Sequence, residues 1–184
     1  MEQSIKDLTL YKGNYLITKK DVPTNSLYLH KVHKRGVQII PLLTKNKQHY
    51  ILLIKSFRFP IRKYIYEFPG GLLDENETIL QCALRELKEE TGWVGSEASL
   101  LVSDCFTNPQ LADGSTDMVL ALIDGNAEAN RKQKQQLDEL EDIETELVEL
   151  GRVDEFVREN LKNQPIGDSL LFFLKSLNSF LPNK

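Results

Sequence analysis

The chain is poor in the residues that mark several large classes of protein. Its 184 residues include only two cysteines, Cys82 and Cys105, which form neither a disulfide framework nor a zinc-binding spacing. No run approaches the ~20 apolar residues of a membrane span. The charged start of the chain also lacks the apolar segment of a signal peptide. The sequence therefore predicts a soluble, cytoplasmic protein.

The chain also lacks an excess of positive charge. The formal net charge is −4, so the chain lacks the broad positive field that nucleic-acid binding usually needs. No nucleic-acid partner is therefore expected. Small anionic substrates remain compatible with this charge, because a bound divalent cation can invert the charge of its surroundings.

Alternating apolar residues and turn residues predict two parts in the chain. Short strands at 8–18 and 26–32, with a turn at 23–25 between them, predict a small N-terminal β-sheet lobe over residues 1–33. Residues 34–184 predict one α/β (α+β) domain with a mixed sheet, and 124–142 form a polar, acidic loop. The strands of this domain are expected at 37–43, 50–57, 100–106, 118–123 and 143–150, with a further strand running from 64 into the glycines at 70–71. The helices of the domain are expected at 78–91, 154–161 and 169–180.

Three glutamates share one face of the first expected helix. Glu90 lies about 40° from Glu86 around the helix axis, and Glu89 lies about 60° away on the other side. Unpaired carboxylates at this spacing repel one another, and a hard cation such as Mg²⁺ or Mn²⁺ relieves that repulsion. Gly70 and Gly71 just before the helix let the backbone approach a ligand closely. Composition alone leaves a second interpretation open, a solvated acidic helix face.

A longer spaced motif favours the metal-binding interpretation. The motif comprises Gly71, five residues, Glu77, seven residues, Arg85-Glu86-Leu87, one residue, Glu89-Glu90, one residue and Gly92-Trp93. It resembles the Nudix box at every fixed position, which is far more specific than a glycine loop alone. The resemblance implies a Nudix α/β/α sandwich in which the box forms a loop, a helix and a second loop.

The same resemblance implies a metal site and a reaction. Glu86, Glu89 and Glu90 would bind Mg²⁺ together with the Gly70 carbonyl, while the residues at Glu77 and Arg85 brace the loop. The substrate would be a nucleoside diphosphate linked to another group. Mg²⁺ neutralises the oxygens of such a substrate and lowers the pKa of an attacking water, and a further carboxylate takes that water's proton.

Three segments outside the box resemble the ADP-ribose and ADP-sugar pyrophosphatase group. Residues 54–60 followed by 66–71 are similar to the group's strand with its substrate arginine and the glycine loop. Residues 109–113 resemble the group's loop after the box, although Gln110 stands where the group has glycine. Residues 138–143 are similar to the acidic loop that delivers the catalytic glutamate.

This resemblance assigns the catalytic carboxylates of the chain. Glu141 is the first choice for the general base and Glu139 the second, and Glu89 takes part through the metal. A solvated charge run is the alternative for the acidic loop.

Four further residues are assigned to substrate binding. Arg58 is expected to bind phosphate, because a guanidinium donates two parallel hydrogen bonds to phosphate oxygens. Glu67 is expected near the terminal ribose or a metal-bound water. Arg35 is a second candidate for phosphate binding, and a solvated arginine is as good an interpretation. Tyr28 is the candidate for stacking on adenine, with packing within a strand as the alternative.

The predicted function is Mg²⁺-dependent hydrolysis of ADP-ribose or a related ADP-sugar to AMP and a sugar phosphate. Other nucleoside diphosphate derivatives (GDP-mannose, NADH or 8-oxo-dGDP) are alternative substrates. A Nudix-fold sensor that binds a nucleotide sugar without hydrolysis is an alternative of another class. The resemblance also implies a homodimer that exchanges its N-terminal strands.

Overall fold

The computed structural model describes residues 7–14, 16–31, 35–139, 141–160 and 165–168, together with residues 170 and 173. A three-stranded antiparallel sheet comprises β1 (Asp7–Lys12), β2 (Leu16–Asp21) and β3 (Leu27–Lys31). A larger mixed sheet comprises β4 (Arg35–Lys45), β5 (Gln48–Arg58), β6 (Lys63–Glu67), β7 (Glu97–Cys105), β8 (Ser115–Asp124) and β9 (Ile143–Glu149). The helices are α1 (Ile79–Thr91) and α2 (Val153–Asn160), with short 3₁₀ helices at Glu128–Asn130 and Leu150–Arg152.

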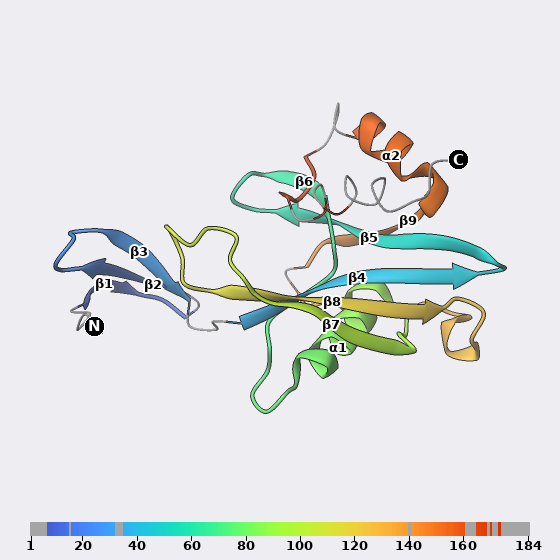
Figure 1. The fold of residues 1–184 in the computed structure, drawn as a ribbon, viewed down its shortest axis with the longest axis horizontal. Helices are drawn as coiled ribbons and strands as arrows, with labels where there is room; N and C mark the ends of the chain where they lie inside the picture. Colours follow the sequence, from blue (N-terminus) through green and yellow to red (C-terminus); the bar gives the residue numbers. More distant parts are fainter. Residues whose placement is uncertain are drawn as a thin grey trace.

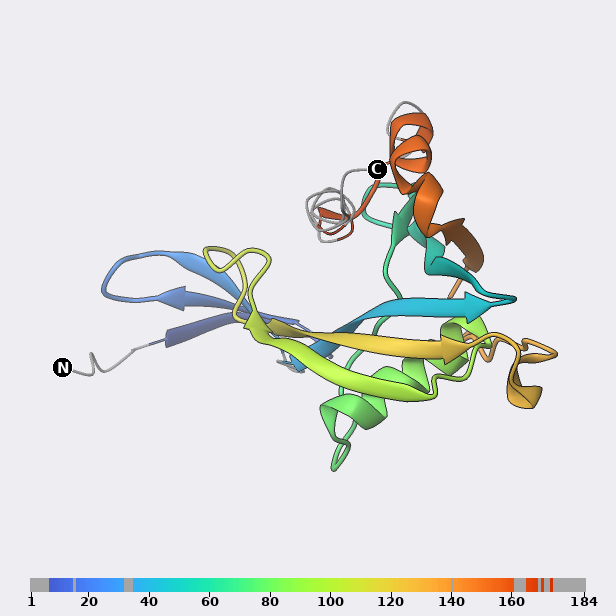
Figure 2. The same ribbon diagram turned by 45° about the vertical axis from the view of Figure 1, so that its right-hand side comes forward.

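The larger sheet lies between the two helices, and the small sheet projects beyond one end of it (Figure 1). Figure 2, turned by 45°, shows α1 and α2 on opposite faces of the larger sheet. Each face buries its own apolar cluster. The α1 cluster includes Ile39, Leu52, Leu87 and Val119, and the α2 cluster includes Ile40, Ile51, Leu53 and Val157. Among the described residues, no helix is long and apolar enough to cross a membrane.

The larger sheet divides at one end, and this division creates space for a ligand site. The antiparallel pairing of β4 with β5 covers only Leu42–Lys45 and Gln48–Ile51. Beyond it, β5 pairs with β6, while β4 pairs with the segment 69–72 through Val37 N–H to Gly71 O (2.8 Å) and Ile39 N–H to Pro69 O (2.8 Å). The chain therefore crosses between the two halves of the divided sheet at 67–72, immediately before the box helix.

Helix α1 has local signals at both ends. Thr78 caps its start and forms a capping box with Gln81, and Gly92 ends it in the left-handed conformation with φ 74°. Its buried stripe of Cys82, Ala83 and Leu87 packs on the sheet. The helix expected over 78–91 is thus confirmed. The helix expected at 154–161 matches α2 closely, and the one expected at 169–180 lies mostly outside the described residues.

The N-terminal part differs from the expectation in one element. The run at 8–18 was expected as a strand, but it forms β1 and β2, joined by a tight turn in which Gly13 N–H donates to Leu16 O (2.9 Å). The alternation of apolar and polar residues continues through this turn, so the sequence pattern does not reveal that the chain reverses direction there. No described side chain from 8 to 31 is buried, and the exposed apolar ones include Leu8, Leu10, Tyr11, Leu16 and Leu27.

Candidate active site

Two cavities meet at the crossing segment, because Gly70, Gly71 and Leu72 line both of them. The first, called here the carboxylate cavity, has a volume of about 570 Å³. Its other lining residues are Leu73, Asp74, Arg85, Glu86, Glu89, Gln136, Asp138 and Glu141. The second, called here the arginine cavity, has a volume of about 650 Å³ and contains Arg58 and Glu67. The α1 carboxylates and Arg58 thus lie on either side of the glycines.

Close packing at these glycines positions the box carboxylates. A Cβ at Gly71 would lie 2.0 Å from Glu86 Oε1, and one at Gly70 would lie 2.2 Å from Val37 O. Gly70 N–H donates to Glu90 Oε2 at 2.8 Å. The missing side chain of Gly71 thus leaves room for the Glu86 carboxylate, and that of Gly70 lets the crossing segment pack against the β4 backbone.

Glu86 and Glu90 are held in an environment that disfavours their negative charge. Burial is the main cause that raises the pKa of Glu90 to about 8, with Glu86, Glu141 and Glu67 adding repulsion against the hydrogen bond from Gly70. Burial also raises the pKa of Glu86, which Arg85 partly opposes, while Glu89 and Glu141 add to the shift. Desolvated carboxylates that repel one another have the oxygen donors and the charge deficit that suit a hard divalent cation.

Arg85 organises the rest of the box. Its Nε donates to Glu77 Oε1 (2.8 Å), and its Nη2 donates to Glu77 Oε2 (2.9 Å) and Leu72 O (3.1 Å). Its Nη1 donates to Glu86 (2.9 Å) and Glu89 (3.0 Å). The guanidinium therefore connects the loop before the helix to the carboxylates on it, which agrees with the bracing role implied by the resemblance.

Glu77 supplies a prediction about stability. The Arg85 guanidinium lowers the pKa of Glu77 from 4.5 to about 2. A folded-state pKa below the unfolded value stabilises the protein fully above about pH 4.5, and this contribution is lost as the pH falls toward 2. Substitution Glu77→Gln should lower the free energy of unfolding by about 3 kcal/mol at pH 7.

Urea unfolding of wild type and Glu77→Gln at pH 7 and pH 3 measures this contribution. The difference between the two proteins should shrink at pH 3. Glu75→Gln, which removes an exposed carboxylate from the same loop, serves as the control and should unfold like wild type. An equal difference at both pH values would show that the ion pair with Arg85 does not contribute in this way.

Arg58 is paired within the arginine cavity. Its Nη2 lies 2.5 Å from Glu67 Oε1, and the same oxygen accepts a hydrogen bond from the Ser56 hydroxyl. The Glu67 side chain is largely buried, whereas that of Arg58 is half exposed. Glu67 thus anchors one part of the guanidinium and leaves the rest facing the cavity.

The acidic loop contacts the C-terminal end of the box helix. Gln136 N–H donates to Glu89 O (2.8 Å), and the Gln135 amide donates to Glu90 O (2.6 Å) and Ile143 O (3.1 Å). Farther along, Asp138 N–H donates to Glu141 Oε2 at 2.9 Å. Glu141 lines the carboxylate cavity, whereas Glu139 is exposed and does not line it. The structure therefore brings Glu141, but not Glu139, to the box glutamates.

Two residues predicted to bind substrate lie outside both cavities. Arg35 donates from Nε and Nη2 to the carboxylate of Asp117 (3.0 and 2.9 Å), which is fully buried. Tyr28 lies on β3 in the small sheet. Within this chain, Arg35 is thus paired with a buried carboxylate while its own side chain stays partly exposed, and Tyr28 faces neither cavity.

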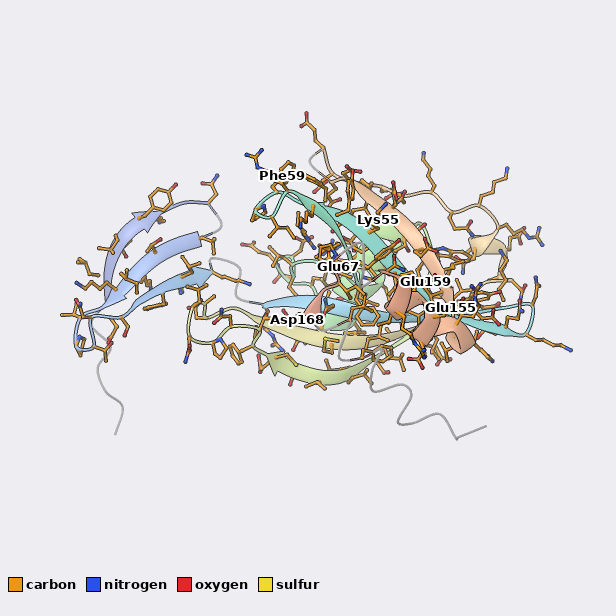
Figure 3. All side chains as sticks on the ribbon, turned by 90° about the horizontal axis from the view of Figure 1, so that it is seen from above. Lys55, Phe59, Glu67, Glu155, Glu159 and Asp168 are labelled. Atoms are coloured by element: carbon orange, nitrogen blue, oxygen red, sulfur yellow. The ribbon has the colours of Figure 1, made fainter. Side chains whose placement is uncertain are left out.

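The arginine cavity also contains polar residues that the sequence did not indicate. They include Lys31, Gln38, Thr107, Ser115 and Asp168. Asp168 reaches the cavity because Gly167 N–H donates to Tyr66 O (2.8 Å), which lays this segment beside β6. Figure 3 shows Asp168 and Glu67 in the central part of the molecule, with Phe59 at the margin of the β5–β6 region. No motif marks these residues, since they come from distant parts of the chain.

The described residues fit a divalent cation by donor type. They contain no group of three or more His, Cys, Asp or Glu side chains already gathered closely enough to hold a metal ion. Glu86 and Glu89 instead share Arg85 Nη1. The buried Glu90 and the largely buried Glu86 nevertheless repel each other, and Glu141 lines the same cavity as Glu86. These three side chains provide carboxylate oxygens of the kind that Mg²⁺ prefers.

Relatives of the chain include several pyrophosphatases. A Caenorhabditis elegans protein named as a Nudix hydrolase is 42% identical over 122 residues, which cover 66% of this chain and 55% of that protein. An ADP-ribose pyrophosphatase of Saccharomyces cerevisiae is 37% identical over 126 residues, 67% of this chain and 54% of that protein. The ADP-sugar pyrophosphatase of Mus musculus is 36% identical over 100 residues, 54% of this chain and 45% of that protein. The matched part of the chain thus spans about half the length of these curated relatives.

The fold and a domain model agree with these similarities. A crystal structure of an ADP compounds hydrolase superposes with a TM-score of 0.64, covering 97% of this chain and 95% of that one at 18% sequence identity. At that identity the likeness concerns the fold. A model of the NUDIX domain matches residues 32–167. Because this match covers well over half of the chain and includes the whole box, the chain belongs to the Nudix family.

Proposed function

We propose that the protein hydrolyses the diphosphate of ADP-ribose or a related ADP-sugar, giving AMP and a sugar phosphate, in the presence of Mg²⁺. The observation that carries this proposal is the junction of the two cavities at Gly70 and Gly71. A carboxylate set suited to a cation lies on one side and a guanidinium suited to phosphate on the other. Relatives named as ADP-ribose and ADP-sugar pyrophosphatases support the choice of substrate.

Glu86, Glu89 and Glu90 would hold the cation, with the Gly70 carbonyl as a further oxygen. When bound, Mg²⁺ (or Mn²⁺ in its place) neutralises the phosphate oxygens and makes a coordinated water more acidic. Arg85 can keep its hydrogen bond from Nε to Glu77 while its Nη1 gives up the bonds to Glu86 and Glu89, because different nitrogens donate to the two groups. The brace would thus survive metal binding.

The remaining residues would orient the substrate and accept the proton. Arg58 would donate to phosphate oxygens, with Glu67 holding its orientation through the 2.5 Å ion pair. Glu141 would take the proton of the attacking water, because its carboxylate belongs to the same cavity as Glu86 and Glu89. Glu67 would also face the terminal ribose.

A substrate panel tests the proposal. Purified protein would be incubated with ADP-ribose, ADP-glucose, GDP-mannose, NADH and 8-oxo-dGDP plus Mg²⁺, and the products separated by chromatography. We expect AMP from an ADP-sugar at the highest kcat/KM. Turnover of another compound without any ADP-sugar turnover would overturn the choice of substrate. Tight binding of ADP-ribose without turnover in excess Mg²⁺ would instead indicate a sensor.

We also propose that residues 1–33 form a dimerisation lobe and that the protein is a homodimer. A three-stranded sheet in which no described side chain from 8 to 31 is buried is hardly stable alone. Leu8 and Leu27 share one face of it, since each pairs with Lys20. Further exposed apolar residues lie on β7 and the following loop, namely Leu100, Leu101, Val102, Phe106 and Leu111.

Light scattering should therefore give the mass of two chains. The double substitution Leu8→Glu and Leu27→Glu should shift the protein to one chain, because it places charge on an apolar interface. Val22→Glu, in the exposed turn between β2 and β3, is the matched control and should leave the dimer intact. A wild-type mass of one chain would remove this part of the proposal.

A further inference from the structure

The side chain of Lys31, at the end of β3, passes over Gly114 and reaches the arginine cavity. Its side chain lies directly over Gly114, where an added Cβ would be 2.2 Å from Lys31 Cδ and 3.0 Å from Cε. Lys31 lines the same cavity as Arg58, Gly70 and Gly71. Gly114 therefore provides the space through which the aliphatic stem of this lysine passes.

The backbone of Lys31 is anchored to the loop on the other side of this passage. Its N–H donates to Asp113 Oδ1 at 2.9 Å, and Leu29 N–H donates to Leu111 O at 2.7 Å. Asp113 N–H donates in return to Leu29 O at 3.2 Å. These bonds hold β3 against the loop before Gly114. They fix the Lys31 backbone beside that glycine, so the side chain is directed across it.

The two cations of this cavity differ in their pairing. Arg58 is matched by Glu67. In the described part of the chain, the Lys31 ammonium has no carboxylate within ion-pair distance. A half-buried lysine that lines a cavity is suited to an anionic ligand group, and a charge-assisted hydrogen bond to a phosphate oxygen would satisfy its ammonium.

We propose that Lys31 is a substrate-binding residue that holds a phosphate group of the nucleoside diphosphate in the arginine cavity, and that Gly114 leaves the space this lysine requires. The proposal rests on the proposed function for the identity of the ligand. It assigns to the N-terminal sheet a direct part in binding the substrate, in addition to its part in assembly.

Calorimetry with α,β-methylene-ADP and Mg²⁺ tests the charge. This probe carries both phosphates but has a carbon in place of the bridging oxygen, so hydrolysis does not disturb the measurement. Lys31→Met should raise Kd about tenfold or more, while Lys31→Arg should stay within about threefold of wild type. Lys12→Met removes the same charge from an exposed position on β1 of the same sheet, which lines neither cavity, and should leave Kd unchanged.

Gly114→Ala tests the passage without removing the charge. The Cβ would displace the flexible part of Lys31 and not the backbone, so the melting temperature should stay close to that of wild type. Kd should nevertheless rise about as much as in Lys31→Met. The double variant should bind no more weakly than Lys31→Met alone, because both changes remove one contact.

Wild-type Kd in Lys31→Met or in Gly114→Ala would overturn the proposal, as would a wild-type protein that does not bind the probe. The proposed function fails by a different result, the absence of AMP from ADP-sugars. A protein that hydrolyses no ADP-sugar but loses probe affinity on Lys31→Met would refute the substrate and retain the role of Lys31.

Discussion

Substitution Glu90→Gln should lower kcat for ADP-ribose by about 100-fold or more, equivalent to about 3 kcal/mol in the activation free energy. The carboxylate of Glu90 is buried at 6% exposure and faces the glycine segment shared by both cavities. Glutamine keeps an oxygen that accepts from Gly70 N–H, but it removes the charge that would bind Mg²⁺. The Mg²⁺ concentration for half-maximal activity should rise as well.

The fold should survive this change. A buried neutral amide avoids the desolvation that opposes the Glu90 carboxylate, so the melting temperature without metal should be no lower than that of wild type. Glu97→Gln, at the exposed start of β7, is the control and should keep wild-type kcat. If Glu90→Gln also kept wild-type kcat at saturating Mg²⁺, Glu90 would have no part in the metal site.

Glu141→Gln should reduce kcat about 100-fold or more while leaving the Kd of α,β-methylene-ADP nearly unchanged. The side chain is exposed within the carboxylate cavity, and its Oε2 accepts from Asp138 N–H. The amide oxygen of glutamine can accept the same bond, so the loop should keep its shape. What the variant loses is a group that can take a proton from water.

Glu139→Gln gives the matched comparison within the same loop. Glu139 is two residues away, exposed and outside the cavity, so its variant should retain kcat and Kd. The reverse result, with loss in Glu139→Gln and retention in Glu141→Gln, would move the role of general base to Glu139. Reduced affinity together with reduced kcat in Glu141→Gln would indicate a metal ligand instead.

Local patterns were most informative for the box helix. The positions of Glu86 and Glu90 follow from helical periodicity, and Thr78 and Gly92 bound the helix through contacts within a few residues. The same kind of pattern was wrong for 8–18, where alternation runs through the turn at Gly13. Alternation reports which side chains share a face and is insensitive to a reversal of chain direction.

Pairings between residues far apart in the sequence could not be predicted from such local patterns. The sequence offered phosphate binding or solvation for Arg35, whereas its bidentate bond to Asp117 joins residues 82 positions apart. The parallel pairing of β4 with β8 brings the two together, with Arg35 opposite Ser115 and Val37 opposite Asp117. A buried carboxylate requires a partner, but the sequence does not indicate which cation supplies it.

The Nudix box is visible in the sequence as spaced glycines and glutamates. The sequence by itself determined the box helix, its capped ends and the carboxylates on one of its faces. These features depend on interactions within about twenty residues. Only the tertiary structure decided that Lys31, which passes over Gly114, and not Arg35 shares the arginine cavity with Arg58. That choice depends on how separate strands and loops pack, and Gly114 admits Lys31 only because β3 is bonded to the loop beside it.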